Sequence, residues 1–442
     1  MIRIGLMSQR IFTFERRRFL AGLGAAAIVP SLPWRVAAEG SQAVRLQAVA
    51  ATIGLRPGQP ATTVWTIQAA TPSLRLEPGS EIELEFQNQL PVFAALDFRG
   101  LEGAATAEPL TSLPPLATGA KANVVLRPRH AGTFFCSLRL LDGGATQPSR
   151  PLPCVVEENQ PIPVDRDEVF LVEDWRLRPD GTAIPPGIDP KGSEELYSVN
   201  GKINPEISVR LHERLRFRFI NGCQRQVIAL KIESHEVRVM ALDGEPAEPF
   251  LARNGALVLA PGGRADAFID ATAQPGSSAQ ILLHDGTVAR PIARLMTSSE
   301  PPTRAALLSG APALPANGLP AELDLRGALR VDLDLTGPEW VPPSNFTVSA
   351  APAFRAKAGR IVVLALANRS DSAAVFHLHG HHFRLLDRLD DGWKPFWLDT
   401  LAVEPGQTQR IAFAAGYTGR WLLESVGTGW TAPRLVRWFG VG

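Results

Sequence analysis

The chain has 442 residues, more than a single ordinary core organises, so we expect two to four domains. Its 45 lysines and arginines against 44 acidic residues leave a formal charge of +1, which argues against nucleic acid as the main partner and against a charge-driven scaffold. Hydrophobic residues make up 45% of the chain, and 38 glycines with 38 prolines supply many turns. This composition favours short strands over long helices and predicts an all-β protein.

The first 38 residues have the features of an export signal. Residues 15–20 read Glu-Arg-Arg-Arg-Phe-Leu and precede a weakly apolar, Gly/Ala-rich stretch, and residues 36–38 are the small side chains that signal peptidases recognise. We interpret residues 1–38 as a twin-arginine signal peptide, which predicts a periplasmic protein whose mature chain starts at Glu39. The alternative is an uncleaved anchor, but the apolar stretch is well short of the ~20 residues that span a bilayer. No transmembrane segment is expected in the mature chain.

Three stretches of the mature chain have the pattern of β-strands that end at an asparagine. Residues 81–86 and 214–219 alternate apolar and charged side chains, which predicts half-buried strands, and residues 361–366 are uniformly apolar, which predicts a strand buried on both faces. Asn88, Asn221 and Asn368 follow them at intervals of 133 and 147 residues. The spacing indicates an internal repeat.

Three cysteines remain in the mature chain, so at most one disulfide can form. Cys136 and Cys154 lie in neighbouring strand-like segments and are the plausible pair, while Cys223 stands apart. The alternative is three buried free thiols that pack as small apolar side chains. The sequence leaves both open.

Glycines support the same repeat. Gly119, Gly262 and Gly406 each precede an alternating strand, 143 and 144 residues apart. A second set follows about a dozen residues later, made up of Gly132, Gly276 and Gly419. Proline-rich separators at 160–163 and 300–320 then place domains at 39–158, 159–300 and 301–442. Units of this size built from antiparallel strands are typical of β-sandwiches or Greek-key barrels.

Several motifs resemble those of multicopper oxidases. Residues 376–383 read Phe-His-Leu-His-Gly-His-His-Phe, and together with 399–406 and 419–422 they resemble the last cupredoxin domain of that family. Residues 173–175, 199–201, 243–244 and 260–266 are similar to its second domain. The resemblance covers nearly the whole mature chain and implies three consecutive cupredoxin-like Greek-key domains.

The same resemblance implies that most copper ligands are absent. The family carries four His-X-His pairs, two more histidines, a cysteine and usually a methionine, whereas this chain has eight histidines in all. Asp97 and Arg99 stand in place of the first pair, and Ser137 and Arg139 in place of the second.

In the last domain, the family's His-Cys-His is matched by Glu424, Ser425 and Val426. Three further ligand positions are held by Ala374, Trp430 and Leu435. Only His377 and His379 match ligands of the trinuclear centre. Because the thiolate is missing as well, we expect no blue copper site in this chain.

The replacements also change the charge of the site. A guanidinium is a permanent cation without a lone pair to offer to copper, so Arg99 and Arg139 oppose its binding. We expect Arg99, Arg139 and Glu424 to be near neighbours. Either they form a buried ion network with Asp97, or they line a solvated cleft open to an anionic ligand.

Three functional hypotheses follow. The one we favour is a non-catalytic periplasmic binding or scaffold protein without a cofactor, or with copper only at low occupancy. It binds a protein partner of unknown identity and resembles the copper-free, twin-arginine-exported relatives that support cell division, so a role in cell division or envelope stress is expected. The second is a copper-dependent oxidoreductase with unorthodox ligands. The third is a mononuclear metal-binding protein that uses His377, His379 and His381, which we expect on one strand face. The alternative to this third hypothesis is that the three histidines bind no metal and are relics held by hydrogen bonds in an interdomain seam.

Replacing both Arg16 and Arg17 by lysine tests the predicted export route. The twin-arginine route recognises the arginine pair and not its charge alone, so the precursor should accumulate in the cytoplasm. Fractionation and immunoblotting of cells expressing the full chain measure this, with the unmodified chain as control. Undiminished export of the lysine variant would contradict the assignment.

Overall fold

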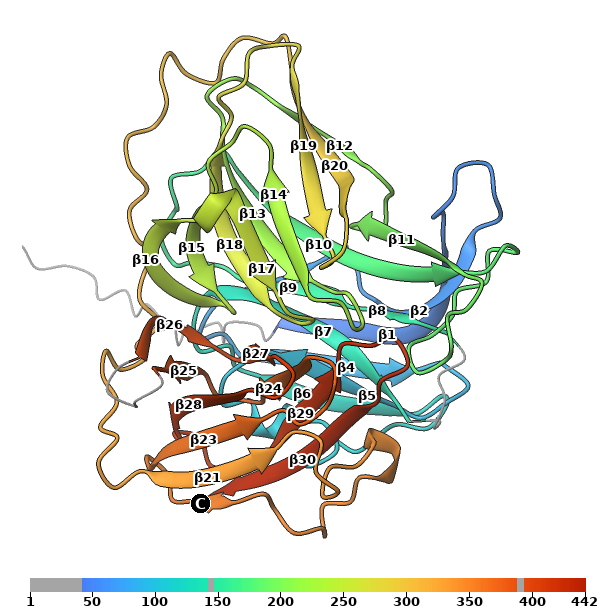
Figure 1. Ribbon diagram of the computed structural model, residues 1–442, viewed down its shortest axis with the longest axis vertical. Helices are drawn as coiled ribbons and strands as arrows, with labels where there is room; N and C mark the ends of the chain where they lie inside the picture. Colours follow the sequence, from blue (N-terminus) through green and yellow to red (C-terminus); the bar gives the residue numbers. More distant parts are fainter. Residues whose placement is uncertain (1–41, 142–146, 388–392) are drawn as a thin grey trace, which may run out of the picture. The chain divides into compact units, whose positions relative to one another are not determined.

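The computed structural model describes residues 42–141, 147–387 and 393–442, and these form β-strands joined by turns (Figure 1). Three short 3₁₀ helices interrupt the strands in this part of the chain, and it contains no α-helix. The predicted signal peptide lies outside the described residues. No helix among the described residues has the length and apolar character needed to cross a membrane.

The first stretch of chain folds into two sheets with the strand orders β6-β4-β1-β2-β8 and β3-β9-β7-β5. The sequential elements are β1 (Gln42–Ile53), β2 (Thr62–Gln68), β3 (Leu74–Leu76), β4 (Ile82–Asn88), β5 (Ala94–Arg99), η1 (Ala105–Ala107), β6 (Lys121–Leu126), β7 (Gly132–Leu140), β8 (Ser149–Arg150) and β9 (Leu152–Val156).

The second stretch forms the sheets β11-β10-β13-β18-β15-β16 and β12-β20-β19-β14-β17. Its elements are β10 (Arg166–Leu177), β11 (Glu194–Val199), β12 (Glu206–Val209), β13 (Arg214–Asn221), β14 (Ile228–Ile232), β15 (Arg238–Leu242), β16 (Glu245–Leu251), η2 (Arg253–Gly255), β17 (Ala256–Leu259), β18 (Arg264–Asp270), β19 (Ser278–His284) and β20 (Ala289–Thr297).

The third stretch forms the sheets β21-β23-β28-β25-β26 and β22-β30-β29-β24-β27. Its elements are β21 (Leu329–Asp334), η3 (Pro343–Asn345), β22 (Arg355–Ala356), β23 (Ile361–Ala367), β24 (Ala374–Leu378), β25 (Phe383–Leu386), β26 (Trp393–Leu398), β27 (Thr400–Val403), β28 (Thr408–Ala414), β29 (Gly419–Gly427) and β30 (Arg434–Val441).

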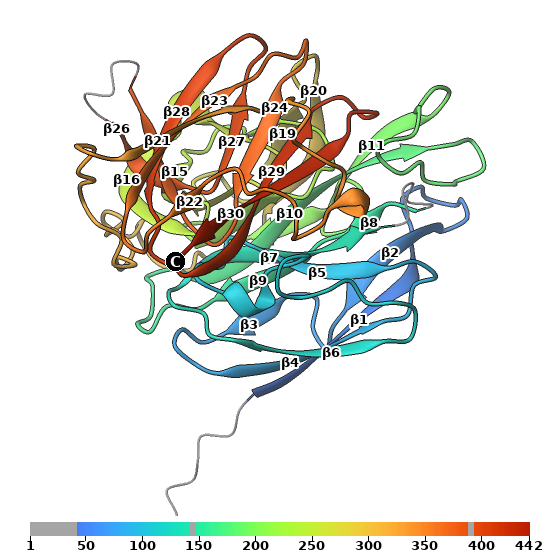
Figure 2. The same cartoon turned by 90° about the horizontal axis from the view of Figure 1, so that it is seen from below.

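Each of the three sheet pairs thus takes its strands from one continuous stretch of chain, as the colours of Figures 1 and 2 show. A large hydrophobic core lies within each pair. The predicted all-β class is confirmed. The predicted borders near residues 158 and 300 fall between the stretches and stay predictions, because the described residues form one compact unit.

Strand β4 alternates buried and more exposed side chains as predicted, but β13 does not. The prediction of a half-buried β13 is wrong, because its arginines are buried as well as its apolar residues. Arg216 and Arg218 donate to the carboxylate of Asp266, so ion pairs take the place of water on that face. The alternation of apolar and charged residues therefore predicted the strand correctly. The charged residues, however, wrongly indicated a solvent-exposed face.

The repeated asparagine makes equivalent hydrogen bonds in all three stretches. The Asn221 amide donates to the carbonyls of Gln226 and Leu259 at 2.9 and 2.8 Å, and its oxygen accepts from the Cys223 N–H at 3.0 Å. Asn88 and Asn368 repeat this pattern at their own positions. A buried primary amide can satisfy two carbonyls and one N–H at once, which explains the repeat physically.

Asn221→Asp tests this role with little change in shape. The substitution puts a carboxylate oxygen against carbonyl oxygens, so the free energy of unfolding should fall by about 2–4 kcal/mol. The exposed strand residue Asn123 supplies the control, since Asn123→Asp should change stability by no more than ~0.5 kcal/mol. Urea denaturation of the three proteins measures the difference. Equal midpoints for both variants would be inconsistent with a structural role for the repeat.

Candidate functional site

Strand pairing brings the predicted site positions together. Strands β5 and β7 are antiparallel neighbours and place Asp97 opposite Ser137. Strands β24 and β29 are antiparallel neighbours in another sheet and place His377 opposite Glu424. Contacts between these strand pairs, described next, form the centre of the site.

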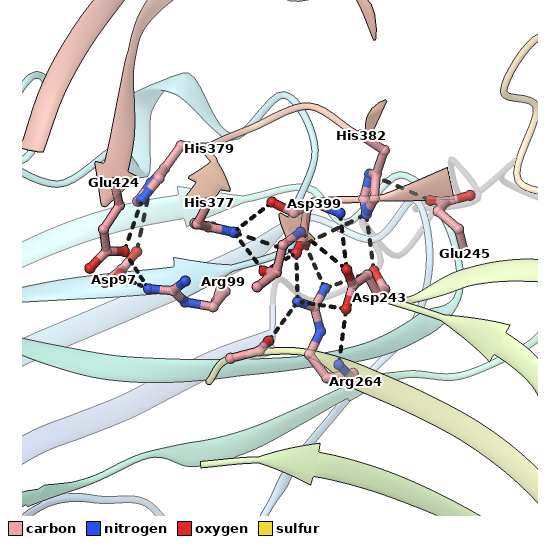
Figure 3. A network of polar contacts seen from close by, with 12 residues as sticks. Asp97, Arg99, Asp243, Glu245, Arg264, His377, His379, His382, Asp399 and Glu424 are labelled. Atoms are coloured by element: carbon pink, nitrogen blue, oxygen red, sulfur yellow. Dashed lines mark hydrogen bonds and ion pairs between the residues drawn. The ribbon is translucent and has the colours of Figure 1, made fainter. Parts of the chain in front are cut away.

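Arg139 lies at the middle of a largely buried group that we call the arginine–carboxylate network, made up of Asp97, Arg99, Arg139, Glu424 and Arg434. Figure 3 shows three of its members, Asp97, Arg99 and Glu424. Its Nη2 is 2.8 Å from Asp97 Oδ2 and 3.1 Å from Glu424 Oε2. Arg99 also donates to Glu424 Oε2, and Arg434 Nη1 lies 2.7 Å from Glu424 Oε1. The expected proximity of Arg99, Arg139 and Glu424 is confirmed.

The network is largely removed from solvent. Glu424 and Asp97 are 0% exposed and Arg139 is 2% exposed. Burial opposes ionisation, but the guanidinium groups of Arg139, Arg434 and Arg99 hold the pKa of Glu424 well below its usual value. The pKa of Asp97 is lowered in the same way, against its burial, by Arg139. Both carboxylates are therefore ionised at neutral pH.

His379 contacts the network directly. Its Nδ1 is 2.9 Å from Glu108 Oε1, and its Nε2 is 3.1 Å from Arg139 Nη2. Burial disfavours the charged ring, but the carboxylates of Glu108 and Asp97 raise the pKa of His379 to about 9. The Arg139 N–H at Nε2 nevertheless requires a free lone pair on that nitrogen, and this contact decides the assignment. We therefore assign a neutral ring that donates from Nδ1 to Glu108.

His377 is held separately, by the start of β27. Its Nδ1 lies 3.0 Å from both the Asp399 carbonyl oxygen and the Thr400 hydroxyl. Burial, with a further contribution from the positive charge of Arg99, lowers the pKa of His377 to about 3. The ring is neutral at neutral pH and donates to the backbone.

The expectation that His377, His379 and His381 share a strand face is wrong. Strand β24 ends at Leu378, and Gly380 turns the chain with a φ of 67°. A Cβ at this glycine would lie 2.2 Å from the Trp421 ring, so only glycine permits the turn. The His377 and His379 rings are 4.7 Å apart, whereas His381 packs among aromatic rings, including Trp421 at 5.2 Å.

The remaining predicted positions are occupied by side chains with structural contacts. Ser425, at the thiolate position, donates to the Leu335 carbonyl oxygen at 2.9 Å. Trp430 donates to the Pro185 carbonyl oxygen and is covered by the guanidinium of Arg176. Ala374 lies in the hydrophobic core of the third stretch, and Leu435 packs against that core. Val426 is buried, and the Ser137 hydroxyl is 3.5 Å from Asp97 Oδ2.

The three cysteines are buried free thiols, so the alternative without a disulfide holds. Cys136 and Cys154 lie on the paired strands β7 and β9, opposite Leu152 and Phe134 respectively, so they are diagonal neighbours. Burial raises the pKa of Cys154 to about 12 and raises those of Cys136 and Cys223 well above the usual value. All three thiols are therefore protonated at neutral pH.

A second buried ion group, which sequence reasoning did not identify as a site, continues from His377 (Figure 3). Arg264 binds both oxygens of Asp399, at 2.9 and 2.7 Å, and its backbone N–H donates to Asp243 at 2.9 Å. Asp243 also accepts from the backbone N–H groups of Asp399 and Thr400. These residues fall in motifs that carried the family resemblance, which was the available signal.

A cavity of about 410 Å³ adjoins the network. Its lining includes Arg99, Arg139, Arg225 and Arg434 together with His377. The Arg225 guanidinium donates to the carbonyls of Gln224 and Ala432, and burial together with the charge of Arg434 lowers its pKa to about 9. Four guanidinium groups thus line the cavity, and three of them, those of Arg99, Arg139 and Arg434, are also paired with Glu424.

Two segments of the chain, 167–280 and 324–441, match family models described as multicopper oxidase, and together they cover more than half of it. A comparison with curated proteins finds no match.

Solved structures are similar over nearly the whole chain. Lac15 from a marine microbial metagenome is 26% identical, with a TM-score of 0.75 over 91% of this chain and 100% of that one. A multi-copper oxidase from Pseudomonas Thermotolerans is 22% identical, with a TM-score of 0.76 and the same coverage. McoA multicopper oxidase from Aquifex aeolicus is 15% identical, with a TM-score of 0.74 over 91% and 96%. These likenesses confirm the predicted fold class of three consecutive cupredoxin-like units.

Glu424→Gln tests the network while keeping the shape of the side chain. Removing the negative charge leaves Arg99, Arg139 and Arg434 undercompensated in a buried space, so unfolding free energy should fall by about 3–5 kcal/mol. The exposed pair of Glu85 and Lys121 provides the control, because Glu85→Gln should cost at most ~1 kcal/mol.

Thermal and urea melts with and without phosphate measure these effects. A neutral Glu424→Gln, combined with a phosphate-induced rise in Tm that Arg99→Ala removes, would contradict the network and favour the open anion-binding cleft.

Proposed function

Since the chain belongs to the multicopper oxidase family, we propose that it is a non-catalytic member that has lost its copper centres and serves as a binding or scaffold protein in the periplasm. The observation that carries this proposal is the position of Arg139, whose Nη2 lies 3.1 Å from His379 Nε2. His379 is one of the two histidines that match trinuclear-centre ligands. One ring nitrogen of His379 therefore faces a permanent cation, and the other is bound to Glu108.

The donor set around the two matching histidines does not suit copper. Guanidinium groups of Arg99 and Arg139 occupy two positions where the family has imidazoles, and neither can lose its proton to bind a metal. His377 Nδ1 is turned to the backbone of Asp399. Carboxylates in the centre are already bound by arginine, so a metal ion would have to displace those ion pairs.

The blue copper position lacks donors of the required type. That centre needs a thiolate and two imidazoles. Ser425 stands at the thiolate position, and its hydroxyl donates a hydrogen bond to a backbone carbonyl. Ala374 and Trp430 stand at the imidazole positions. Loss of this site removes electron entry, and loss of the trinuclear site removes oxygen reduction, which supports a non-catalytic role.

The cationic cavity supports the binding role. Four arginines line a space of about 410 Å³ that a small ligand or a partner's side chain could enter. A partner that presents carboxylate or phosphate groups matches this lining. The identity of the partner, including any link to cell division, remains part of the proposal.

Spectroscopy and turnover test the proposed function. The purified mature protein, incubated with excess Cu²⁺ and then desalted, should lack the intense blue thiolate-to-copper absorption and should not oxidise phenolic dyes or ferrous iron above background. The reason is the absence of donors at the matched positions. An active multicopper oxidase treated identically is the control. Several stoichiometric coppers per chain, or turnover that His377→Ala abolishes, would overturn the proposal.

A further inference from the structure

Two groups of potential metal ligands occur among the described residues: Asp97, His379 and Glu424, which are in contact with Arg139, and a second group apart from the arginine–carboxylate network. The second group comprises Glu102, His130, Glu245 and His382, and we call it the four-residue cluster. Each member comes from a different segment: the loop after β5, the loop before β7, the start of β16 and the loop before β25. One ligand atom from each lies within 4.8 Å of all the others, and every side chain is buried by more than nine-tenths.

Each histidine of this cluster is oriented by a hydrogen bond from its outer nitrogen, the ring nitrogen that faces away from the two glutamates. His130 Nδ1 is 3.1 Å from the Ala131 carbonyl oxygen, and His382 Nε2 is 3.0 Å from that of Asp243. Carbonyl oxygens only accept, so both outer nitrogens carry the proton. The inner nitrogens, His130 Nε2 and His382 Nδ1, then face the two glutamates. A backbone carbonyl bound to the outer nitrogen is the usual second contact of a metal-binding histidine.

Side chains outside the cluster also orient the two glutamates. The Tyr417 hydroxyl donates to Glu102 Oε2 at 2.8 Å, and the Asn317 amide lies 3.3 Å from Glu245 Oε2. Glu245 Oε1 is buried and lies 3.2 Å from His130 Nε2, but among the described residues it makes no contact with the geometry of a hydrogen bond. A buried carboxylate oxygen without a hydrogen bond is costly unless an ion compensates it.

The separations match the edges of a metal-centred tetrahedron. Zinc bonds of 2.0–2.2 Å to nitrogen and oxygen place neighbouring ligand atoms about 3.4 Å apart. His130 Nε2 is 3.2 Å from Glu245 Oε1 and 3.6 Å from Glu102 Oε2. His382 Nδ1 is 2.8 Å from Glu102 Oε1 and 3.7 Å from Glu245 Oε1. Glu102 faces the two histidines through different oxygens, so an ion would be centred once this carboxylate turns a single oxygen toward both of them.

We propose that the four-residue cluster is a structural site for one divalent cation of the zinc class. Two neutral imidazoles and two carboxylates give a closed, four-coordinate set that neutralises a doubly charged ion and leaves no open position for a substrate. The carboxylates of this cluster pair with histidines, whereas those of the arginine–carboxylate network pair with guanidinium groups. Because the ligands come from four segments, the bound ion would tie the three stretches of chain together.

The competing arrangement is a metal-free network in which both histidines are protonated and paired with the glutamates. It has the same net charge, so charge balance alone does not separate the two. They differ in whether the cluster takes up a metal ion.

Zinc titration of the mature chain separates the two arrangements. Chelator-treated protein should bind one Zn²⁺ per chain by calorimetry, its Tm should rise by several degrees with zinc, and Co²⁺ should give the visible absorption of a tetrahedral nitrogen–oxygen site. Glu245→Gln and His130→Gln should each weaken zinc binding by about tenfold or more. Melts of the metal-free variants report separately on folding.

His235→Gln is the matched control, since His235 is also a buried histidine with its Nδ1 against a backbone carbonyl. It should leave zinc binding unchanged. Absence of stoichiometric zinc binding by the unmodified chain, or equal affinity in Glu245→Gln and His130→Gln, would overturn the site. These outcomes are independent of the proposed loss of copper, because Glu245 and His130 are not at copper-ligand positions.

Discussion

The balance of charge around Arg139 is the interaction on which the rest of this site depends. A guanidinium that is 2% exposed is unfavourable unless carboxylates compensate it, and Asp97 and Glu424 do so at 2.8 and 3.1 Å. Glu424 in turn has three arginine neighbours. Each charge is therefore stable only in the presence of the others, and removal of one leaves a buried charge uncompensated.

This balance couples stretches of chain that are distant in sequence. Asp97 and Arg139 come from the first stretch, Arg264 and Asp243 from the second, and Glu424 with Asp399 from the third. The contact of Arg264 with Asp399 continues the charge pairing beyond His377 (Figure 3). Ion pairs thus connect all three stretches, and the proposed function assigns the positions of Arg99, Arg139 and Glu424 to former copper ligands. Charge-assisted hydrogen bonds offset the free-energy cost of burying these charges, because most donors in the centre have an acceptor within hydrogen-bond distance.

Much of the fold followed from local pattern. Alternating residues predicted strands, and the repeated Asn88, Asn221 and Asn368 marked equivalent buried turns whose hydrogen bonds the structure explains. The proximity of Arg99, Arg139 and Glu424 followed from the family resemblance, since these positions converge in the shared fold.

Other features depended on tertiary contacts that no local pattern reports. The arginines of β13 were expected at the surface, but ion partners on other strands bury them. His381 was grouped with His377 and His379 by spacing of two residues, yet the turn at Gly380 directs it to the Trp421 ring. The four-residue cluster escaped detection because its members lie on separate segments without any shared motif.

Crystals of the mature protein equilibrated with excess Cu²⁺ offer the most direct test of the central claim, that an arginine–carboxylate network has replaced copper. Anomalous diffraction at the copper edge should show no peak within bonding distance of His377 or His379, with Arg139 still bound to Asp97 and Glu424. Copper peaks on both histidines, with Arg99 and Arg139 displaced from the centre, would contradict the account.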